Sequence, residues 1–323
     1  MSTIIGASPP PPGVTSNFQN PADVLWSVGL VTNGLALGLT TLVTLGRFYV
    51  RFWITGAVFL EDWFCFVSWF LNVGFCIVGL LGSLYGGGGY HAWEISPASM
   101  IKFQKLEYAA VIVYGPAVWC IKVTLLLILV RVFTPFRRII TGVWAFIYAM
   151  LLYYVIVTVV KVFRCSPIPA VWDPDKPGKC LDGFLLFTID TSLSILTDVI
   201  ILILPIPLVW SLQVTTKKKL RTIALLGAGG VATATSIVRL ILVLNLDNSP
   251  YQLGDQTISI QRINLLVTAE LSIGIICACL PAFNIFFASD RAHSQSRSRS
   301  IYVNTPLKLS NLFILTKSKV AGT

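Results

Sequence analysis

Seven long apolar stretches dominate the sequence and limit what it can fold into. Each has roughly the length, about 20 residues, with which an α-helix crosses the hydrocarbon core of a bilayer. Only 12% of the 323 residues are charged, about half the usual share of a soluble domain. The sequence therefore predicts an all-α, polytopic membrane protein, a seven-transmembrane-helix bundle with the lipid bilayer as its main partner. The predicted spans are residues 24–45, 62–84, 106–130, 139–163, 183–207, 220–244 and 263–287.

The distribution of Lys and Arg predicts how the spans are oriented, because positively charged loops resist translocation. With the N-terminus outside, the cytoplasmic segments hold 15 of the 24 Lys and Arg residues, the outer segments six and the spans three. This clustering explains the net charge of +10 better than a nucleic-acid surface would. We expect an extracellular tail at 1–23, a membrane domain at 24–288 and a basic cytoplasmic tail at 289–323.

The two tails are polar. Residues 1–22 lack a cationic segment followed by an apolar stretch, so we expect no cleavable signal peptide and assign insertion to the first span. Residues 294–300 alternate serine with arginine or glutamine, a composition that cannot bury enough apolar area to fold alone. The cytoplasmic tail is therefore expected to be disordered.

Charged side chains inside the spans are the main candidates for function, because they are costly in a bilayer and usually face the bundle interior. Measured along each helix, four fall in the outer half: Glu107, Asp190, Arg239 and Glu270. Lys122 and Asp198 fall deeper. Matching depths predict that Arg239 faces Glu270 or Asp190 and that Lys122 faces Asp198. These groups either fix the helix register as ion pairs, or bind a ligand or handle protons.

The outer layer contains three carboxylates and one arginine by this count. A carboxyl group without a cationic partner can hold a proton, as a general acid requires. Asp190 and Glu270 are therefore the catalytic candidates if the protein is an enzyme. Asp190 and Asp198, eight residues apart, lie near one face of the fifth span, which predicts that this span lines the functional pocket.

Two of the seven cysteines, Cys165 and Cys180, fall in a loop that this topology places outside the cell, where disulfides persist. We expect them to be bridged. The other five, which lie in spans as small apolar residues, are Cys65, Cys76, Cys120, Cys277 and Cys279. No metal site is predicted, because the cysteine spacing fits no zinc pattern and the two histidines are expected on opposite sides of the membrane. His91 follows a glycine run in the first outer loop and is either a ligand contact or a structural loop residue.

Several short motifs resemble the fungal rhodopsin-domain integral membrane proteins, a family with satratoxin-cluster members. The resemblance covers residues 24–288 and lacks the cysteine-rich extracellular domain of the receptor-like branch. Glu61-Asp62-Trp63 stands where the family usually has Asp-Asp-Trp. The other motifs are Arg47-Phe-Tyr-Val-Arg51, Tyr85-Gly86 through His91, Lys122 with Arg131, Cys165-Ser-Pro167, Trp172-Asp173, Gly178-Lys179-Cys180, Asp198 with Leu204-Pro-Ile-Pro207, Ser236-Ile-Val-Arg239, and Glu270 with Cys277-Ala-Cys-Leu-Pro281.

The resemblance implies a multi-pass fungal protein of the plasma membrane or an endomembrane, encoded with a secondary-metabolite pathway as some relatives are. Retinal is not expected, since the seventh span has no lysine, and no other cofactor is predicted. One hypothesis is a receptor that binds a small lipophilic ligand and transmits through a kink at Pro281. No receptor signature identifies its cytoplasmic signalling partner. The alternative is a membrane-embedded cyclase or isomerase that acts on a lipophilic intermediate.

Overall fold

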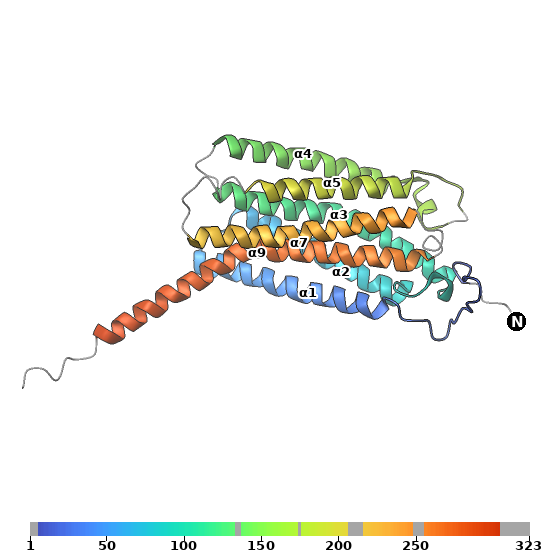
Figure 1. Cartoon of the computed structure of the whole chain (residues 1–323), viewed down its shortest axis with the longest axis horizontal. Helices are drawn as coiled ribbons and strands as arrows, with labels where there is room; N and C mark the ends of the chain where they lie inside the picture. Colours follow the sequence, from blue (N-terminus) through green and yellow to red (C-terminus); the bar gives the residue numbers. More distant parts are fainter. Residues whose placement is uncertain (1–5, 133–136, 174–175, 206–215, 248–254, 304–323) are drawn as a thin grey trace, which may run out of the picture.

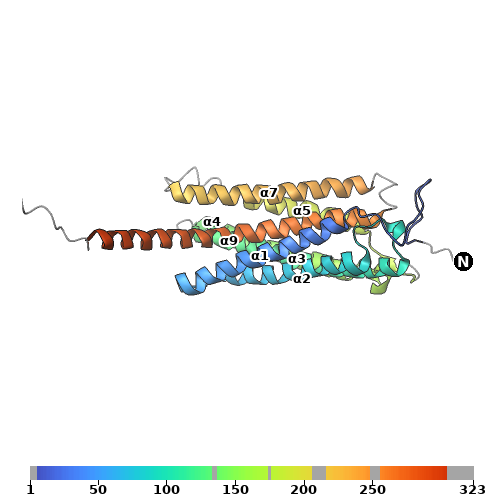
Figure 2. The same ribbon diagram turned by 90° about the horizontal axis from the view of Figure 1, so that it is seen from below.

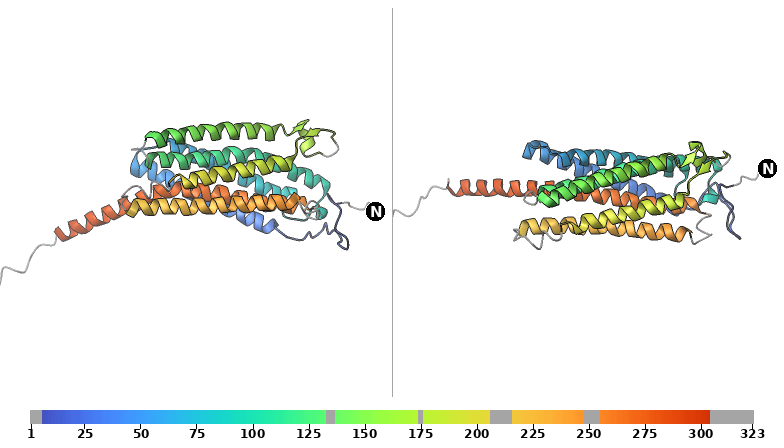
Figure 3. Two further views of the ribbon diagram at one scale, coloured as in Figure 1. Left: turned by 45° about the horizontal axis from the view of Figure 1, so that its top comes forward. Right: turned by 90° about the horizontal axis from the view of Figure 1, so that it is seen from above.

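The computed structural model describes residues 6–132, 137–173, 176–205, 216–247 and 255–303. Within this part, seven long α-helices lie side by side as one elongated bundle (Figure 1). They are α1 (Trp26–Tyr49), α2 (Leu60–Gly86), α3 (Pro97–Val132), α4 (Arg137–Val162), α5 (Gly183–Ile203), α7 (Thr216–Asp247) and α9 (Gln256–Val303). Figures 2 and 3 show α5 and α7 on one side of the bundle and α1 and α2 on the other, with α9 between them.

Six of these helices, all except α7, are long and apolar enough to cross a membrane. In α7, the apolar part among the described residues is the shorter stretch Gly229–Asn245. Large apolar side chains point outward from the bundle, such as Leu42 on α1, Phe70 on α2 and Leu152 on α4, which are 64–69% exposed. An apolar outer surface of this kind suits lipid rather than water.

The two ends of the bundle differ in character. At one end, the short antiparallel strands β1 (Cys165–Ser166) and β2 (Lys179–Cys180) flank the 3₁₀ turn η3 (Ile168–Val171). Cys165 and Cys180 form the predicted disulfide, and we call this the disulfide end. The N-terminal segment lies at the same end (Figure 1), where the Ala7 N–H donates to the carbonyl of Ile95. The opposite end, where α1 turns into α2 and α3 finishes, carries Arg47, Arg51 and Arg131, and we call it the arginine end.

Helix α1 begins where Asp23 supplies a hydrogen-bond acceptor for its first turn. The Asp23 carboxylate accepts from the backbone N–H groups of Trp26 at 2.9 Å and Ser27 at 3.2 Å. Such acceptors satisfy N–H groups that have no partner inside the helix. Hydrogen bonds from the Ser27 side chain first, and then from the two backbone groups, lower the pKa of Asp23. The carboxylate is thus held in the charged form that suits a helix N-terminus.

Several helix boundaries differ from the predicted spans. α3 begins at Pro97 rather than at residue 106. The added part contains Lys102, Gln104 and Lys105, which lower its hydropathy, and its start is capped by the Ser96 hydroxyl, which accepts from the Ser99 N–H at 3.2 Å. α5 ends at Ile203 and is followed by a turn at Leu204 and Pro205, and only residues 206–207 of the predicted fifth span lie outside the described residues. Helices commonly extend beyond the apolar stretch by which hydropathy locates them.

The largest difference is in α9, which runs to Val303, well past the predicted end of the last span. This part was expected to belong to a disordered tail, whereas the structure has it as helix. No proline or glycine interrupts the chain between Pro281 and Val303, so nothing local stops the helix. Figure 1 shows α9 leaving the direction of the bundle in its last part. Residues 304–323 of the expected tail lie outside the described residues.

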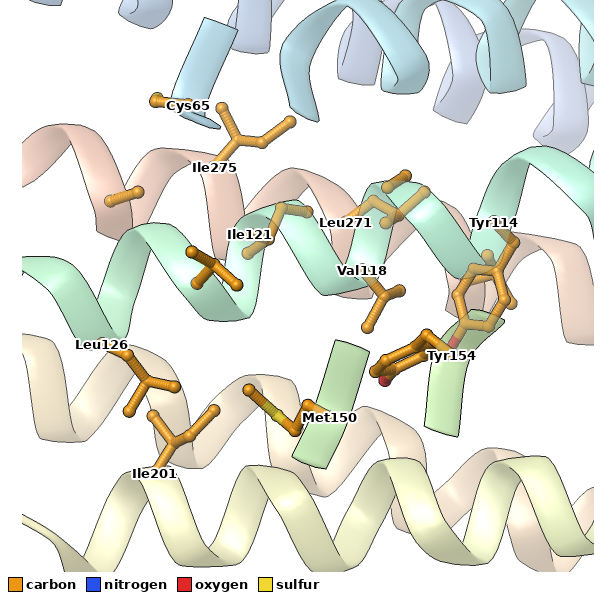
Figure 4. Packing of buried hydrophobic residues seen from close by; sticks show 14 of the residues in the cluster. Cys65, Tyr114, Val118, Ile121, Leu126, Met150, Tyr154, Ile201, Leu271 and Ile275 are labelled. Atoms are coloured by element: carbon orange, nitrogen blue, oxygen red, sulfur yellow. The ribbon is translucent and has the colours of Figure 1, made fainter. Parts of the chain in front are cut away.

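The apolar core forms around α3. Figure 4 shows Val118, Ile121 and Leu126 of α3 among side chains from neighbouring helices, including Met150 of α4 and Leu271 of α9. A Cβ atom on Gly274 would lie 2.7 Å from Cγ2 of Ile121. Glycine at this position therefore lets α9 approach α3 closely, which brings polar side chains of the two helices into contact.

Candidate functional site

The first buried ion pair joins α7 to α9 through a tyrosine of α3. Arg239 Nη1 lies 3.0 Å from Glu270 Oε2, and the two side chains are only 1% and 7% exposed. Arg239 Nη1 also donates to the Tyr114 hydroxyl at 2.7 Å, and this hydroxyl donates to Glu270 Oε2 at 3.2 Å. The predicted contact between Arg239 and Glu270 is present. Tyr114 was not identified from the sequence because its hydroxyl carries no charge.

A second buried pair joins α4 to α5. Lys161 Nζ lies 2.6 Å from Asp190 Oδ2, and the side chains are 7% and 4% exposed. The Tyr153 hydroxyl donates to Asp190 Oδ1 at 3.0 Å. The sequence count of one cation in the outer layer was wrong, because it left out Lys161. The cation sits near the end of the fourth span, and sequence alone does not tell whether such a residue faces the loop or the interior.

The third pair lies deeper, between α3 and α5. Lys122 Nζ is 2.9 Å from Asp198 Oδ1, as matching depths predicted. The ammonium group also donates to the Ser194 hydroxyl at 3.0 Å and to the Thr197 hydroxyl at 2.7 Å. Lys122 thus has several acceptors, which a buried ammonium group needs in order to offset its lost hydration.

Together the three pairs connect α3, α4, α5, α7 and α9. Asp190, Asp198 and Glu270 each have a cationic partner within 3.0 Å. The two catalytic candidates, Asp190 and Glu270, are therefore both engaged in ion pairs between helices.

Glu107 differs from the other three carboxylates. Its Oε1 accepts from the Asn264 amide at 2.6 Å, which joins α3 to α9, and its side chain is only partly buried. Among the described residues it forms no ion pair. Asn264 belongs to a polar seam, since the next turn of α9 places the Thr268 hydroxyl 3.3 Å from Asn33 Oδ1 of α1. Glu107 is thus a carboxyl group open to a further partner.

His91 lies at the disulfide end, outside the long helices. Its Nδ1 is 2.5 Å from Asp255 Oδ2, whose other oxygen accepts from the Ala92 N–H at 3.1 Å. The His91 ring stacks on Trp93 with 4.3 Å between ring centroids. These contacts tie the loop between α2 and α3 to the start of α9. Asp255 was not predicted, because a single loop aspartate has no distinguishing pattern in the sequence.

The glycine run before His91 is needed for this arrangement. Gly89 has φ +101°, and a Cβ atom there would lie 2.3 Å from the backbone nitrogen of Trp26. Only glycine adopts this backbone conformation readily, and no larger residue fits against α1. The motif therefore lets the loop pack on the first helix.

The arginine end contains a second charged cluster, whose three arginines fall in loops according to the predicted spans. Arg47 donates to Asp62 Oδ1 through Nη2 at 2.6 Å and through Nε at 2.8 Å. Arg51 Nε lies 3.3 Å from the same oxygen, and Arg51 Nη2 lies 3.5 Å from Glu61 Oε1. Arg131 Nη1 donates to Glu61 Oε1 at 3.0 Å. This arginine cluster of five residues joins α1, α2 and α3.

Arg47 is fully buried, with 0% of its side chain exposed, although it was expected in a cytoplasmic loop. α1 continues to Tyr49 and is followed by the π-helical turn η1 (Val50–Thr55), so Arg47 lies inside the bundle. There it also donates to the carbonyl of Ala278 in α9. Arg47 and Asp62 both belong to sequence motifs that resemble the family. The motifs do not reveal that the two residues pair.

The apolar outer surface, the six helices of spanning length and the charged interior define an integral, multi-pass helical membrane protein. Residues 46–289 match the family described as "Fungal rhodopsin domain", and the chain belongs to this family. It is 29% identical over 203 residues to a "SAT4 family membrane protein" of Emericella nidulans, a match that covers 62% of this chain and 50% of the relative. This chain thus spans about half the length of that relative.

Two further relatives are named for biosynthetic gene clusters. The "Polyenoic acids biosynthesis gene cluster protein Ba17b" of Metarhizium anisopliae is 26% identical over 263 residues, which cover 75% of this chain and 68% of the relative. The "Satratoxin biosynthesis SC1 cluster protein 4" of Stachybotrys chartarum is 24% identical over 164 residues, which cover 50% of this chain and 58% of the relative. The relatives of this chain therefore include proteins named for secondary-metabolite clusters.

Proposed function

We propose that this chain is a receptor-like sensor in fungal secondary metabolism, which binds a small lipophilic ligand in the disulfide-end half of the bundle. The observation that carries the proposal is Glu107. It is the one carboxylate among Glu107, Asp190, Asp198 and Glu270 that forms no ion pair in the described part of the chain and is partly exposed. A ligand with an amine or hydroxyl group would provide Glu107 with a second donor beside the Asn264 amide.

The buried ion pairs provide a route from this site to the other helices. Tyr114 lies two turns after Glu107 on α3 and bonds to both Arg239 and Glu270. A ligand that moves α3 relative to α9 would therefore also change the contacts of α7. α9 contains Pro281 and continues to the arginine end. A cytoplasmic partner that binds there would respond to the altered position of α9. A ligand shifts the balance between two conformations only if it makes different contacts in each of them. A ligand that contacts α3 and α9 would meet this condition.

The proposal includes seven spans with the N-terminus outside. Two observations support this orientation: the disulfide lies at the end that holds the N-terminal segment, and disulfides persist outside the cytosol. Acceptor sequons for N-glycosylation inserted after Asp173 and in the α7–α9 connection are expected to be modified. Sequons in the α3–α4 and α5–α7 connections should stay unmodified. Glycosidase-sensitive shifts in gel mobility measure this, and the reverse pattern would rule out the orientation.

A membrane-embedded cyclase or isomerase is the second candidate, and Glu107 also favours it. An unpaired carboxyl group can hold and deliver a proton. Glu107 fits the role of general acid better than Asp190 or Glu270, because these two face Lys161 and Arg239. The two candidate functions thus share a site but differ in what its loss does to metabolites.

Glu107→Gln is expected to reproduce the effect of deleting the gene, since it removes the charge but keeps the shape of the side chain. For a sensor, the variant changes the amounts and timing of pathway products and of pathway transcripts, with no new intermediate. For an enzyme, it accumulates an unconverted precursor. Metabolite profiling by mass spectrometry, with transcript measurement in the same cultures, separates the two.

Lys105→Gln is the matched control, because it also removes a charge from this part of α3 but faces the Trp172 ring on another side. It should keep the wild-type profile. A gene deletion that alters neither metabolites nor transcripts would contradict both candidate functions. A Glu107→Gln profile like that of wild type, with deletion still effective, would contradict the assigned site.

A further inference from the structure

Two buried cysteines from distant parts of the sequence meet near the arginine end. Cys65 of α2 and Cys279 of α9 are 214 residues apart, yet their Sγ atoms lie 3.8 Å from each other. Both residues are 0% exposed. The other three free cysteines are Cys76, Cys120 and Cys277, and among the described residues none of them makes such a sulfur contact. The proximity is therefore specific to one pair.

A positively charged side chain lies near both thiols of the pair. Arg47 is close enough to both thiols to interact with them electrostatically, and it donates to the carbonyl of Ala278, directly before Cys279. A guanidinium group stabilises a nearby thiolate, which is the reactive form. Asp62 offsets part of this effect, since its carboxylate bonds to Arg47.

We propose that Cys65 and Cys279 form a peroxide-sensitive pair that closes to a disulfide between α2 and α9. The oxidant is hydrogen peroxide, a small uncharged molecule that enters bilayers. One thiolate attacks a peroxide oxygen, the O–O bond breaks, and a sulfenic acid and hydroxide form; hydroxide takes up the proton that the thiol lost and becomes water. The second thiol then attacks the sulfenic sulfur and releases a second water. Both sulfurs are oxidised and one peroxide is reduced to two waters.

The bond would fix α9 to α2 two residues before Pro281. In the reduced protein the two helices meet there through side-chain contacts, whereas a disulfide would prevent α9 from shifting at this level. The site is separate from the bridge between Cys165 and Cys180, which lies at the disulfide end. It is also independent of any ligand at Glu107.

The test uses the full chain reconstituted in lipid nanodiscs and treated with hydrogen peroxide. After alkylation of remaining thiols under denaturing conditions and proteolysis, mass spectrometry is expected to find the peptides of Cys65 and Cys279 joined, with a mass lowered by two hydrogen atoms. Reduction should separate them. Cys277→Ala, a substitution two residues away on the same helix, should leave this product unchanged.

Cys65→Ala and Cys279→Ala should each abolish the product and leave the remaining thiol as a sulfenic acid that a dimedone probe traps. Size-exclusion chromatography of each variant verifies that it is folded, and Cys65→Ser or Cys279→Ser replaces any alanine variant that is not. The proposal is overturned if folded wild-type protein gives no such product at any peroxide concentration that oxidises methionine in the same sample. It is also overturned if Cys277 replaces either partner in the bridge.

Discussion

Asp62→Ala is expected to destabilise the folded bundle by about 3–5 kcal/mol, the usual effect of removing one partner from a buried ion pair. Asp62 bonds to Arg47 through two nitrogens and approaches Arg51. Without it, the fully buried Arg47 keeps, within the described ranges, only the Ala278 carbonyl as an acceptor. The substitution should sharply lower the yield of monodisperse protein after detergent extraction and lower its thermal unfolding temperature.

The members of the arginine cluster are expected to differ in how strongly their substitution destabilises the bundle. Arg47→Met should cost less than Asp62→Ala, because Asp62 retains Arg51 as a partner at 3.3 Å. Lys176→Ala is the control, since its pair with Asp173 is more than half exposed on the lysine side, and exposed pairs contribute about 0–1 kcal/mol. Equal unfolding temperatures for Asp62→Ala and Lys176→Ala would show that the cluster does not stabilise the bundle.

The sequence predicts the long helices, six of which are apolar enough over a sufficient length to cross a membrane, and two of the three interior ion pairs; both predictions rest on distance along a helix. An α-helix rises about 1.5 Å per residue, so the position of a charge in a span gives its depth. Lys122 with Asp198, and Arg239 with Glu270, were matched in this way. Depth does not tell which way a side chain points around the helix, and this is why the partner of Asp190 was missed.

The arginine cluster was missed for a different reason. Counting Lys and Arg in loops gives the direction of a span but treats every flanking arginine as solvated. Arg47 is buried because α1 extends past the predicted span and because Asp62 lies close to it in the first turn of the next helix. Such a pairing depends on how two helices pack, a property that hydropathy and charge counts do not contain.

Arg239→Met is the second substitution with a large expected effect. It leaves Glu270, whose side chain is 7% exposed, with the Tyr114 hydroxyl as its one hydrogen-bond donor in the part of the chain that the structure describes. We expect a loss of about 3–5 kcal/mol, as for other broken buried pairs. Glu270→Leu should be equally damaging, because Arg239 then keeps a full charge beside a neutral tyrosine. Thermal unfolding in nanodiscs measures each loss.

The double variant with both substitutions separates stability from function. Replacing a buried ion pair by apolar residues of similar volume is often neutral or stabilising, so it should recover most of the stability that either single variant loses. If the pair carries the signal from Glu107, the refolded double variant will still show the metabolite and transcript changes of the Glu107→Gln strain. A double variant that is stable and also has a wild-type profile would limit Arg239 and Glu270 to holding α7 against α9. The route from the ligand site would then have to pass through the Asn264 and Thr268 seam between α3, α9 and α1.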